Sequence, residues 1–106
     1  MSQNYLARAE KCFSFISMLI ELSKGKKLTG YDMVVHLREF GFDVSPGTTY
    51  HQLDMLSKNG IIREKKRPWG KTNKTVYEMT EEGKEIFQEF KKRWKKPLEY
   101  AAANLQ

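Results

Sequence analysis

Apolar residues near the N-terminus recur every three or four positions, the period of one face of an α-helix. Between residues 4 and 23 this stripe consists of Leu6, Ala9, Phe13, Ile16 and Ile20. Three further apolar residues widen it: Phe15, Leu19 and Leu22. The pattern predicts a helix over residues 4–23 that is buried on two sides and ends at the loop SKGKK.

A second helix is predicted to begin at TGYD. Thr29 can accept a hydrogen bond from the first turn while Asp32 reaches back to it, which is a variant of the capping box. We expect four of its residues to face inward: Tyr31, Val34, Val35 and Leu37. Gly41 should end this helix after Phe40.

The third helix begins in the stretch DVSPGTTYHQLDMLSKNG. Ser45 is a favourable N-cap, and Pro46 suits the first helical position because its missing N–H has no partner there. The core-facing residues are expected to be Pro46, Thr49, Leu53 and Leu56. On the opposite face lie Gly47, Thr48, His51, Asp54, Met55 and Lys58, with Tyr50 on the flank. A plain surface helix more often carries Glu, Lys and Ala, so the polar first two turns indicate a contact surface.

Beyond Gly60 the pattern changes to two short strand candidates, IIREK and KTVYEM. Between them lies KRPWGKTN, in which Pro68 and Gly70 predict a turn. This part should form a β-hairpin with a basic tip that carries Trp69. Three helices followed by a hairpin predict a winged helix-turn-helix.

Thr80 is expected to cap a long final helix whose apolar residues recur in steps of three and four. This seam consists of Phe87, Phe90, Trp94, Pro97, Ala101 and Asn104 or Leu105. Such a seam is typical of a coiled-coil-like contact. Pro97 should kink the helix or start a second one. The expected fold is α+β and mostly α, with a winged helix-turn-helix over residues 1–79 and a C-terminal dimerisation helix over residues 80–106.

The net charge of +6 is concentrated in two short stretches. Residues 63–74 carry a net +5, and residues 91–96 carry another +5. A polyanion is therefore a plausible partner. Cys12 is the single cysteine and cannot form an internal disulfide, which suits a reducing compartment. No apolar run approaches the length of a membrane span, so we expect a cytoplasmic protein.

Three stretches together resemble the PadR family of transcriptional regulators: LTGYDMVVHL, VSPGTTYHQLDMLSKNGII and VYEMTEEGKEIF. The combination of GY, SPGT-Y and Y-x-x-T-x-x-G carries the resemblance, which covers roughly residues 13–87. The resemblance implies a homodimeric repressor of a bacterium or archaeon that binds double-stranded DNA. It also implies that the third helix enters the major groove, while the wing contacts the backbone or minor groove. The first and last helices would form the dimer.

Within the resembling recognition-helix motif, the matching residues are Ser45, Gly47, Thr48 and Tyr50. We expect Thr48, His51 and Gln52 to read bases and Tyr50 to donate to a phosphate; alternatively, Tyr50 packs at the edge of the core and His51 is merely solvated. This chain has Thr49 where the family usually has Leu, and His51 where it often has Pro. The wing residues expected to add nonspecific affinity are Lys65, Lys66, Arg67, Lys71 and Lys74. Trp69 could pack on the wing, stack on the DNA backbone or contact a partner.

The expected dimer contacts are Leu6, Phe13, Phe87, Phe90, Trp94 and Ala101. The chain's end at Gln106 favours the family subgroup with one dimerisation helix. In KKRWKK, Trp94 lies on the seam and the basic residues cover the outer faces of the helix. We prefer this interpretation to a basic helix that binds a membrane or calmodulin. Some family members hold flat aromatic ligands between tryptophans at the dimer interface, so Trp94 is also a candidate ligand contact for a small aromatic effector.

Two other classes of function stay open: a winged-helix adaptor that binds protein, and a ligand-responsive sensor. An enzyme is not expected. His36 and His51 lie on different predicted helices, and Cys12 lies in an apolar one. The chain has no Gly-rich phosphate loop, paired Cys motif or His-Glu-x-x-His sequence. We therefore predict no catalytic residues, no metal and no cofactor.

Overall fold

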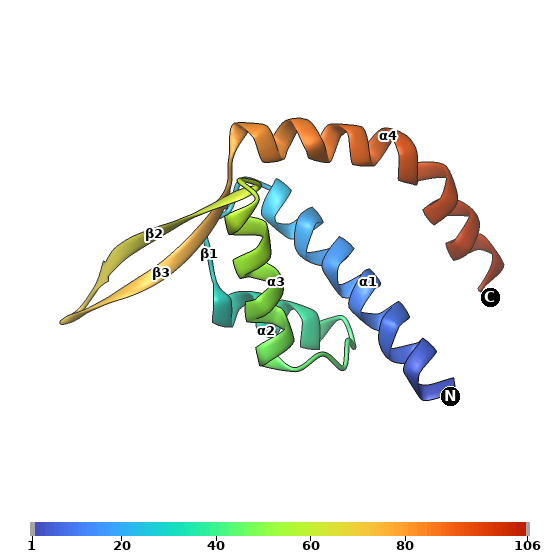
Figure 1. Cartoon of the computed structure of the whole chain (residues 1–106), viewed down its shortest axis with the longest axis horizontal. Helices are drawn as coiled ribbons and strands as arrows, with labels where there is room; N and C mark the ends of the chain where they lie inside the picture. The colour runs from blue at the N-terminus through green and yellow to red at the C-terminus, as the bar shows by residue number, and fades with distance from the viewer. Residues whose placement is uncertain (1, 106) are drawn as a thin grey trace.

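The computed structural model describes residues 2–105. Their elements follow in the order α1 (Ser2–Ser23), β1 (Leu28–Thr29), α2 (Gly30–Glu39), α3 (Pro46–Lys58), β2 (Ile62–Trp69), β3 (Thr72–Met79) and α4 (Glu81–Asn104). In Figure 1 the hairpin of β2 and β3 projects to one side, and α1 and α4 extend toward the other. The expected mostly helical winged helix-turn-helix fold is confirmed.

The sheet has three strands in the described residues, in the order β1-β3-β2, rather than the predicted two. β1 was missed because it contains only two residues, which pair with Val76 and Tyr77 of β3. The wing is also longer than expected, since pairing extends from Ile62↔Met79 to Trp69↔Thr72. Pro68 therefore lies within β2 instead of in the turn. β2 is an edge strand, where a residue without an N–H is tolerated.

The core lies where α1, α2, α3, the base of the wing and the start of α4 meet. Its buried residues are Met18, Leu22, Met33, Leu37, Leu53, Leu56, Ile62, Met79 and Phe87. On α2 the buried positions are Gly30, Met33, Val34 and Leu37. The prediction that Tyr31 faces inward was wrong: it is 66% exposed, because it lies off this stripe at the start of the helix. Pro46 was also wrongly assigned to the core, since it is exposed at the entrance of α3.

The predicted helix caps are confirmed. Thr29 Oγ1 accepts a hydrogen bond from the Asp32 N–H (3.0 Å), and Asp32 Oδ2 accepts one from the Thr29 N–H (2.9 Å). Ser45 Oγ accepts from the Thr48 N–H at 3.1 Å, with Pro46 as the first helical residue. Gly41 and Gly60 follow the ends of α2 and α3 with φ of 83° and 76°, the left-handed conformation that favours glycine. These caps set where α2 and α3 begin and end.

Thr80 and Gly83 attach α4 to the end of α3. The Thr80 N–H donates to the carbonyl oxygen of Ile61 at 3.0 Å, and its hydroxyl lies 2.6 Å from the carbonyl oxygen of Gly60. The Gly83 N–H donates back to Thr80 Oγ1 at 2.9 Å. A Cβ on Gly83 would lie only 2.1 Å from the Ile61 carbonyl oxygen. Glycine at this position therefore permits the close approach of α4.

α4 continues through Pro97 as one helix, and Figure 1 shows it bending in its second half. This outcome fits the predicted kink and excludes a separate second helix within the described residues. A proline inside a helix removes one backbone hydrogen bond and crowds the preceding turn, which accounts for the bend. No helix within residues 2–105 combines the length and apolar composition needed to cross a bilayer.

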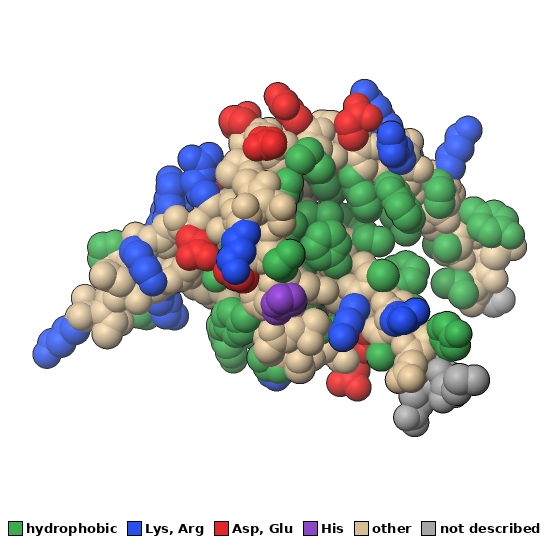
Figure 2. Space-filling view, in the orientation of Figure 1, with side chains coloured by type: hydrophobic (Ala, Val, Ile, Leu, Met, Phe, Trp, Pro, Cys, Tyr) green, Lys and Arg blue, Asp and Glu red, His purple; other side chains and the backbone are tan. Residues whose placement is uncertain are grey.

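The stripe that first predicted α1 is largely exposed in the single chain. Leu6, Phe13 and Ile20 are all exposed, whereas Ser14, Met18 and Leu22 face the core. Figure 2 shows hydrophobic side chains gathered along the space between α1 and α4. The second buried side expected for α1 is therefore only partly covered by residues 2–105.

A polar cluster joins α1 to α2 at the side of the core. Glu21 is 8% exposed, and its carboxylate accepts hydrogen bonds from Lys26 Nζ at 3.0 Å and Lys24 Nζ at 3.1 Å. His36 Nδ1 lies 3.7 Å from the same carboxylate, and His36 Nε2 is 3.0 Å from Ser17 Oγ. The hydrogen bond from Lys26 is the main cause that lowers the pKa of Glu21 below its ordinary value of 4.5, although burial opposes it.

We expect Glu21→Gln to lower the free energy of unfolding at pH 7 by about 1 kcal/mol, because hydrogen bonds to a charged acceptor are lost. A carboxyl whose pKa is lowered by folding stabilises the protein above its unfolded pKa, and this contribution disappears as pH falls through the folded pKa. The difference between wild type and variant should therefore be constant above about pH 5.5 and should vanish in stronger acid. Urea unfolding at several pH values measures it. Glu81→Gln, in an exposed pair with Lys84, is the control and should change stability by only about 0.3 kcal/mol.

Candidate nucleic-acid interface

The first turn of α3 is open to solvent and is held in shape by Ser45. Besides accepting from the Thr48 N–H, the Ser45 hydroxyl donates to Thr48 Oγ1 at 3.0 Å. The Thr48 hydroxyl thus has its own proton left to donate outward. A Cβ on Gly47 would meet nothing nearer than Ser45 Oγ at 3.9 Å, so this turn presents a flat, accessible backbone. Both residues lie where a partner could approach α3 closely.

Tyr50 packs against the start of α2, which was one of the two alternatives for it, and stays partly exposed. Its ring packs on Gly30, since a Cβ there would lie 2.1 Å from Tyr50 Cε1. The side chain is nevertheless 46% exposed. Contact with α2 thus fixes the direction of the ring and leaves part of it accessible. His51, one residue later, is exposed on the same end of α3.

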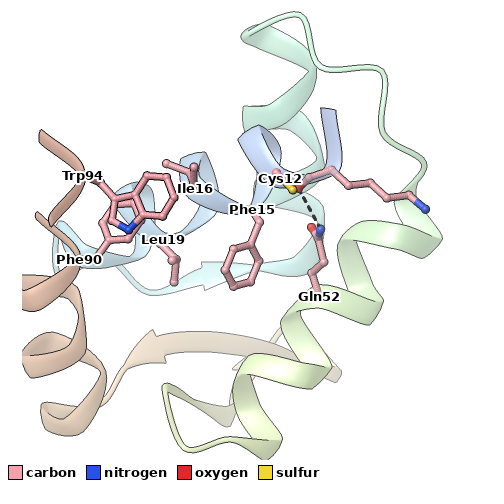
Figure 3. A pocket seen from close by; sticks show the side chains of 8 residues that line it. Cys12, Phe15, Ile16, Leu19, Gln52, Phe90 and Trp94 are labelled. Carbon is pink, nitrogen blue, oxygen red and sulfur yellow. Dashed lines mark hydrogen bonds between the residues drawn. The ribbon is translucent and has the colours of Figure 1, made fainter. Parts of the chain in front are cut away.

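Gln52 does not join these residues. Its Nε2 donates to the carbonyl oxygen of Lys11 in α1 at 3.4 Å, and its Oε1 is buried with no hydrogen-bond partner among the described residues. In Figure 3 the side chain points toward α1. A position next to His51 in sequence is about 100° away around the helix, which turns Gln52 from the open face to the packed one. The structure therefore gives no support to Gln52 as a base-reading residue.

The strand register divides the basic residues of the wing between two faces. Arg63, Lys65, Arg67 and Lys74 share one face, and Lys66 lies on the other, since side chains alternate along a strand. Glu78 binds two of them: Lys65 Nζ at 2.8 Å and Arg63 Nε at 3.4 Å. The Lys65 hydrogen bond is the main cause that lowers the pKa of Glu78 below 4.5. Lys65 thus already has a carboxylate partner within the wing, unlike the basic residues nearer the tip.

The tip of the wing carries the stronger positive field. Arg67 and Lys74 face each other directly across the two strands, and Lys71 lies in the turn. Like charges placed opposite each other destabilise a strand pair, so an anion between them would be favourable. Lys66 Nζ donates to Thr75 Oγ1 at 2.7 Å. In Figure 2 blue basic side chains surround the projecting wing.

Trp69 packs within the wing, one of the three positions considered for it. Lys74 Nζ lies 4.1 Å from the centre of its ring, a distance that allows a cation–π interaction. The indole is still 61% exposed. The contact holds Lys74 in place on its face of the hairpin.

A second site lies between α1, α3 and α4. This cleft has a volume of about 430 Å³ and is lined by Lys11, Cys12, Phe15, Ile16, Leu19, Gln52, Phe90 and Trp94. Figure 3 shows Trp94 and Phe90 on one side and Phe15 and Gln52 on the other. The rings of Phe90 and Trp94 are stacked with their centres 5.8 Å apart. Of the predicted interface residues, Phe87 belongs instead to the core of the single chain, with 9% exposure.

Sequence reasoning did not find most of this cleft, because its walls come from three helices far apart in the chain. It also missed Tyr31, which lies beside Tyr50 at the base of the wing. A stricter reading of the three- and four-residue spacing of Gly30, Met33 and Leu37 would have placed Tyr31 outside the core stripe.

Comparisons with known proteins agree with this geometry. Residues 18–89, about two thirds of the chain, match the sequence model described as the transcriptional regulator PadR-like family. No curated protein matches the chain by sequence.

Several solved structures are similar over much of the chain. A PadR family transcription regulator from Clostridium difficile is 22% identical with a TM-score of 0.74, over 89% of this chain and 99% of that one. A Streptococcus transcriptional regulator is 29% identical with a TM-score of 0.65 over all of both chains. Bacillus subtilis PadR, solved in complex with operator DNA, is 25% identical with a TM-score of 0.63, over 74% of this chain and 46% of that one. The chain belongs to the PadR-like family of transcriptional regulators.

Proposed function

We propose that this protein binds operator DNA as a homodimer and represses transcription by occupying its site. The observation that carries the proposal is the open N-terminal half of α3, presented on the same molecule as a basic wing. An α-helix fits the major groove, and its first turns reach base edges in helix-turn-helix proteins. The similarity to Bacillus subtilis PadR, solved on operator DNA, supports the same partner for this chain.

In this proposal each group on α3 has a different task. Thr48 and His51 are placed to exchange hydrogen bonds with bases, and Gly47 lets the helix backbone come close to the groove. Tyr50 is braced by Gly30 and donates its hydroxyl proton to a phosphate. Specificity comes from base contacts and affinity largely from phosphate contacts.

The wing supplies positive charge for the DNA backbone. The contributing residues are Lys66, Arg67, Lys71 and Lys74. Lys65 contributes less, because its ammonium group is 2.8 Å from the Glu78 carboxylate. Each phosphate that a Lys or Arg neutralises releases counterions, so binding should weaken steeply as salt rises.

A second copy of the chain covers the apolar face of α1 and α4. This face includes Leu6, Phe13, Phe90, Trp94 and Ala101, of which Leu6, Phe13 and Trp94 are exposed in the single chain. Contiguous apolar surface of this kind marks an interaction site. A two-fold dimer presents the same face twice and would place two α3 helices in successive major grooves.

A ligand-responsive sensor is the second candidate, and the cleft beside Trp94 favours it. A volume of about 430 Å³ lies within the usual range of small-molecule sites, and the lining is mostly apolar. A planar aromatic effector bound there should quench Trp94 fluorescence, which a Trp69→Phe variant would isolate. Unchanged emission across a broad panel of such compounds would contradict the sensor.

Selection of bound sequences from a random duplex pool tests the main proposal. We expect one preferred site whose log Kd rises linearly with log salt concentration. Arg67→Gln should reduce the slope by about 1, because one phosphate contact is lost. Lys92→Gln is the matched control: it removes an exposed cation of α4, already 3.5 Å from Glu89, and should leave the slope unchanged. Failure of the wild type to bind any duplex at moderate salt would instead favour the protein-binding adaptor.

A further inference from the structure

A separate groove lies at the base of the wing, between the start of α2, the flank of α3 and β3. Its volume is about 260 Å³, and its walls are Thr29, Gly30, Tyr31, Tyr50, Lys74, Thr75 and Tyr77. We name it the tyrosine groove. It connects the exposed flank of α3 to the wing, the two parts of the molecule assigned to DNA above.

The lining of the tyrosine groove consists of hydrogen-bond donors. Five of its residues carry hydroxyl groups, and none carries a carboxylate. Lys74 also lines the groove, but its ammonium group lies over Trp69, on the face of the hairpin opposite Thr75 and Tyr77. Hydroxyl groups form strong hydrogen bonds with ionised oxygens. The chemistry therefore suits an oxyanion with several exposed oxygen atoms.

Contacts around the groove hold its donors in place. The Tyr50 ring packs on Gly30. Thr29 and Thr75 each accept a hydrogen bond, from the Asp32 N–H and from Lys66, and so keep their own protons to donate. Burial is the main cause that raises the pKa of Tyr77, which keeps its phenol protonated. Tyr31 is 66% exposed and forms the outer wall.

Nearby carboxylates oppose an anion only weakly. Asp32 is bound to the Thr29 N–H at 2.9 Å, and Asp54 is paired with Lys58 at 3.0 Å. Glu64 lies opposite Tyr77 in the strand register and so faces the same side of the sheet as Tyr77. Lys66, next in the same register, lies on the same face and offsets this negative charge.

We propose that the tyrosine groove binds one phosphodiester of the DNA backbone, with Tyr31 and Tyr50 as its principal donors. This inference rests on the proposed function and assigns Tyr31 to the DNA contact. It gives the protein an anchor between the base-reading turn of α3 and the tip of the wing. Such a backbone contact fixes the position and orientation of α3 on the duplex, although it carries no information about the base sequence.

The test measures Kd for the selected duplex with Tyr31→Phe, which removes only the hydroxyl group. We expect binding about tenfold weaker at every salt concentration, the effect of losing one hydrogen bond to a charged acceptor. The salt slope should not change, because Tyr31 carries no charge. By contrast, Lys74→Gln removes a cation of the wing and should lower both the affinity and the slope, the latter by about 1.

Duplexes with single neutral methylphosphonate linkages then locate the phosphate. At one position, the neutral linkage should weaken binding by the wild type. On that duplex, Tyr31→Phe should bind as tightly as the wild type. Tyr100→Phe is the matched control, because Tyr100 is 70% exposed on α4 and lies outside the groove. It should bind all of these duplexes like the wild type.

The results of these experiments distinguish failure of the groove proposal from failure of the proposed function. A wild type that binds its selected duplex while Tyr31→Phe binds equally well overturns the groove and leaves the proposed function standing. The groove is also overturned if the Tyr31→Phe defect persists at every neutralised linkage, since it then arises from folding or from another contact. A wild type without duplex affinity overturns both.

Discussion

Gly83→Ala is expected to destabilise the fold by at least about 2 kcal/mol and to lower the melting temperature by about 10 °C. The added Cβ would lie 2.1 Å from the Ile61 carbonyl oxygen, 2.9 Å from Met79 Cγ and 3.0 Å from the Ile61 carbonyl carbon. Two of these three atoms are backbone, so α4 must move away. That movement would strain the hydrogen bonds of Thr80 to the end of α3. The helix propensity gained by replacing glycine recovers only about 1 kcal/mol.

Gly47→Ala is the matched control, because Gly47 is also a helical glycine but has open space around its Cβ position. It should be neutral or stabilising by up to about 1 kcal/mol. Thermal and urea unfolding at one protein concentration compare the two variants, since the stability of a dimer depends on concentration. Equal stability of Gly83→Ala and wild type would show that α4 does not need this close approach.

Phe13→Glu is expected to convert the proposed dimer to monomers and to weaken the proposed operator binding by about two orders of magnitude or more. The carboxylate would be buried in the proposed apolar contact, and two-fold symmetry introduces it twice. Phe13 is 48% exposed in the single chain and outside its core, so the monomer should remain folded. Loss of the second half-site removes the effective-concentration gain of about 10²–10⁴ that bivalent binding provides.

Sedimentation velocity measures the dimer, and circular dichroism confirms folding. Phe40→Glu is the control, because Phe40 is an exposed phenylalanine next to the end of α2 and outside the proposed interface. It should remain dimeric. A Phe13→Glu protein that sediments as a dimer, or a wild type that is a folded monomer, would contradict the proposed interface.

Local chemistry made the element order predictable. The capping residues Thr29, Ser45 and Thr80 act within three residues of their own positions, so their partners can be read from the sequence. The basic hairpin was predicted from Gly70 and its flanking strands for the same reason. β1 was missed because two residues carry no periodicity of their own and pair with β3 about 50 residues away.

The candidate site was only partly predictable. Sequence reasoning placed Gly47, Thr48 and His51 near the open start of α3, as the structure has them. It could not place Gln52, because its partner is a carbonyl oxygen of α1, 41 residues away. Similarly, Glu78 engages Lys65, and Phe87 enters the core, through contacts between separate elements.

By itself the sequence determined the winged helix-turn-helix order, the ends of its helices and the residues offered at the start of α3, because these depend on caps, turns and periodicity within about one helical turn. Only the tertiary structure decided which apolar face of α1 enters the core, which basic residues keep their charge free, and that three tyrosines from α2, α3 and β3 meet in one groove. Those outcomes depend on how distant elements pack, and no local pattern specifies that packing.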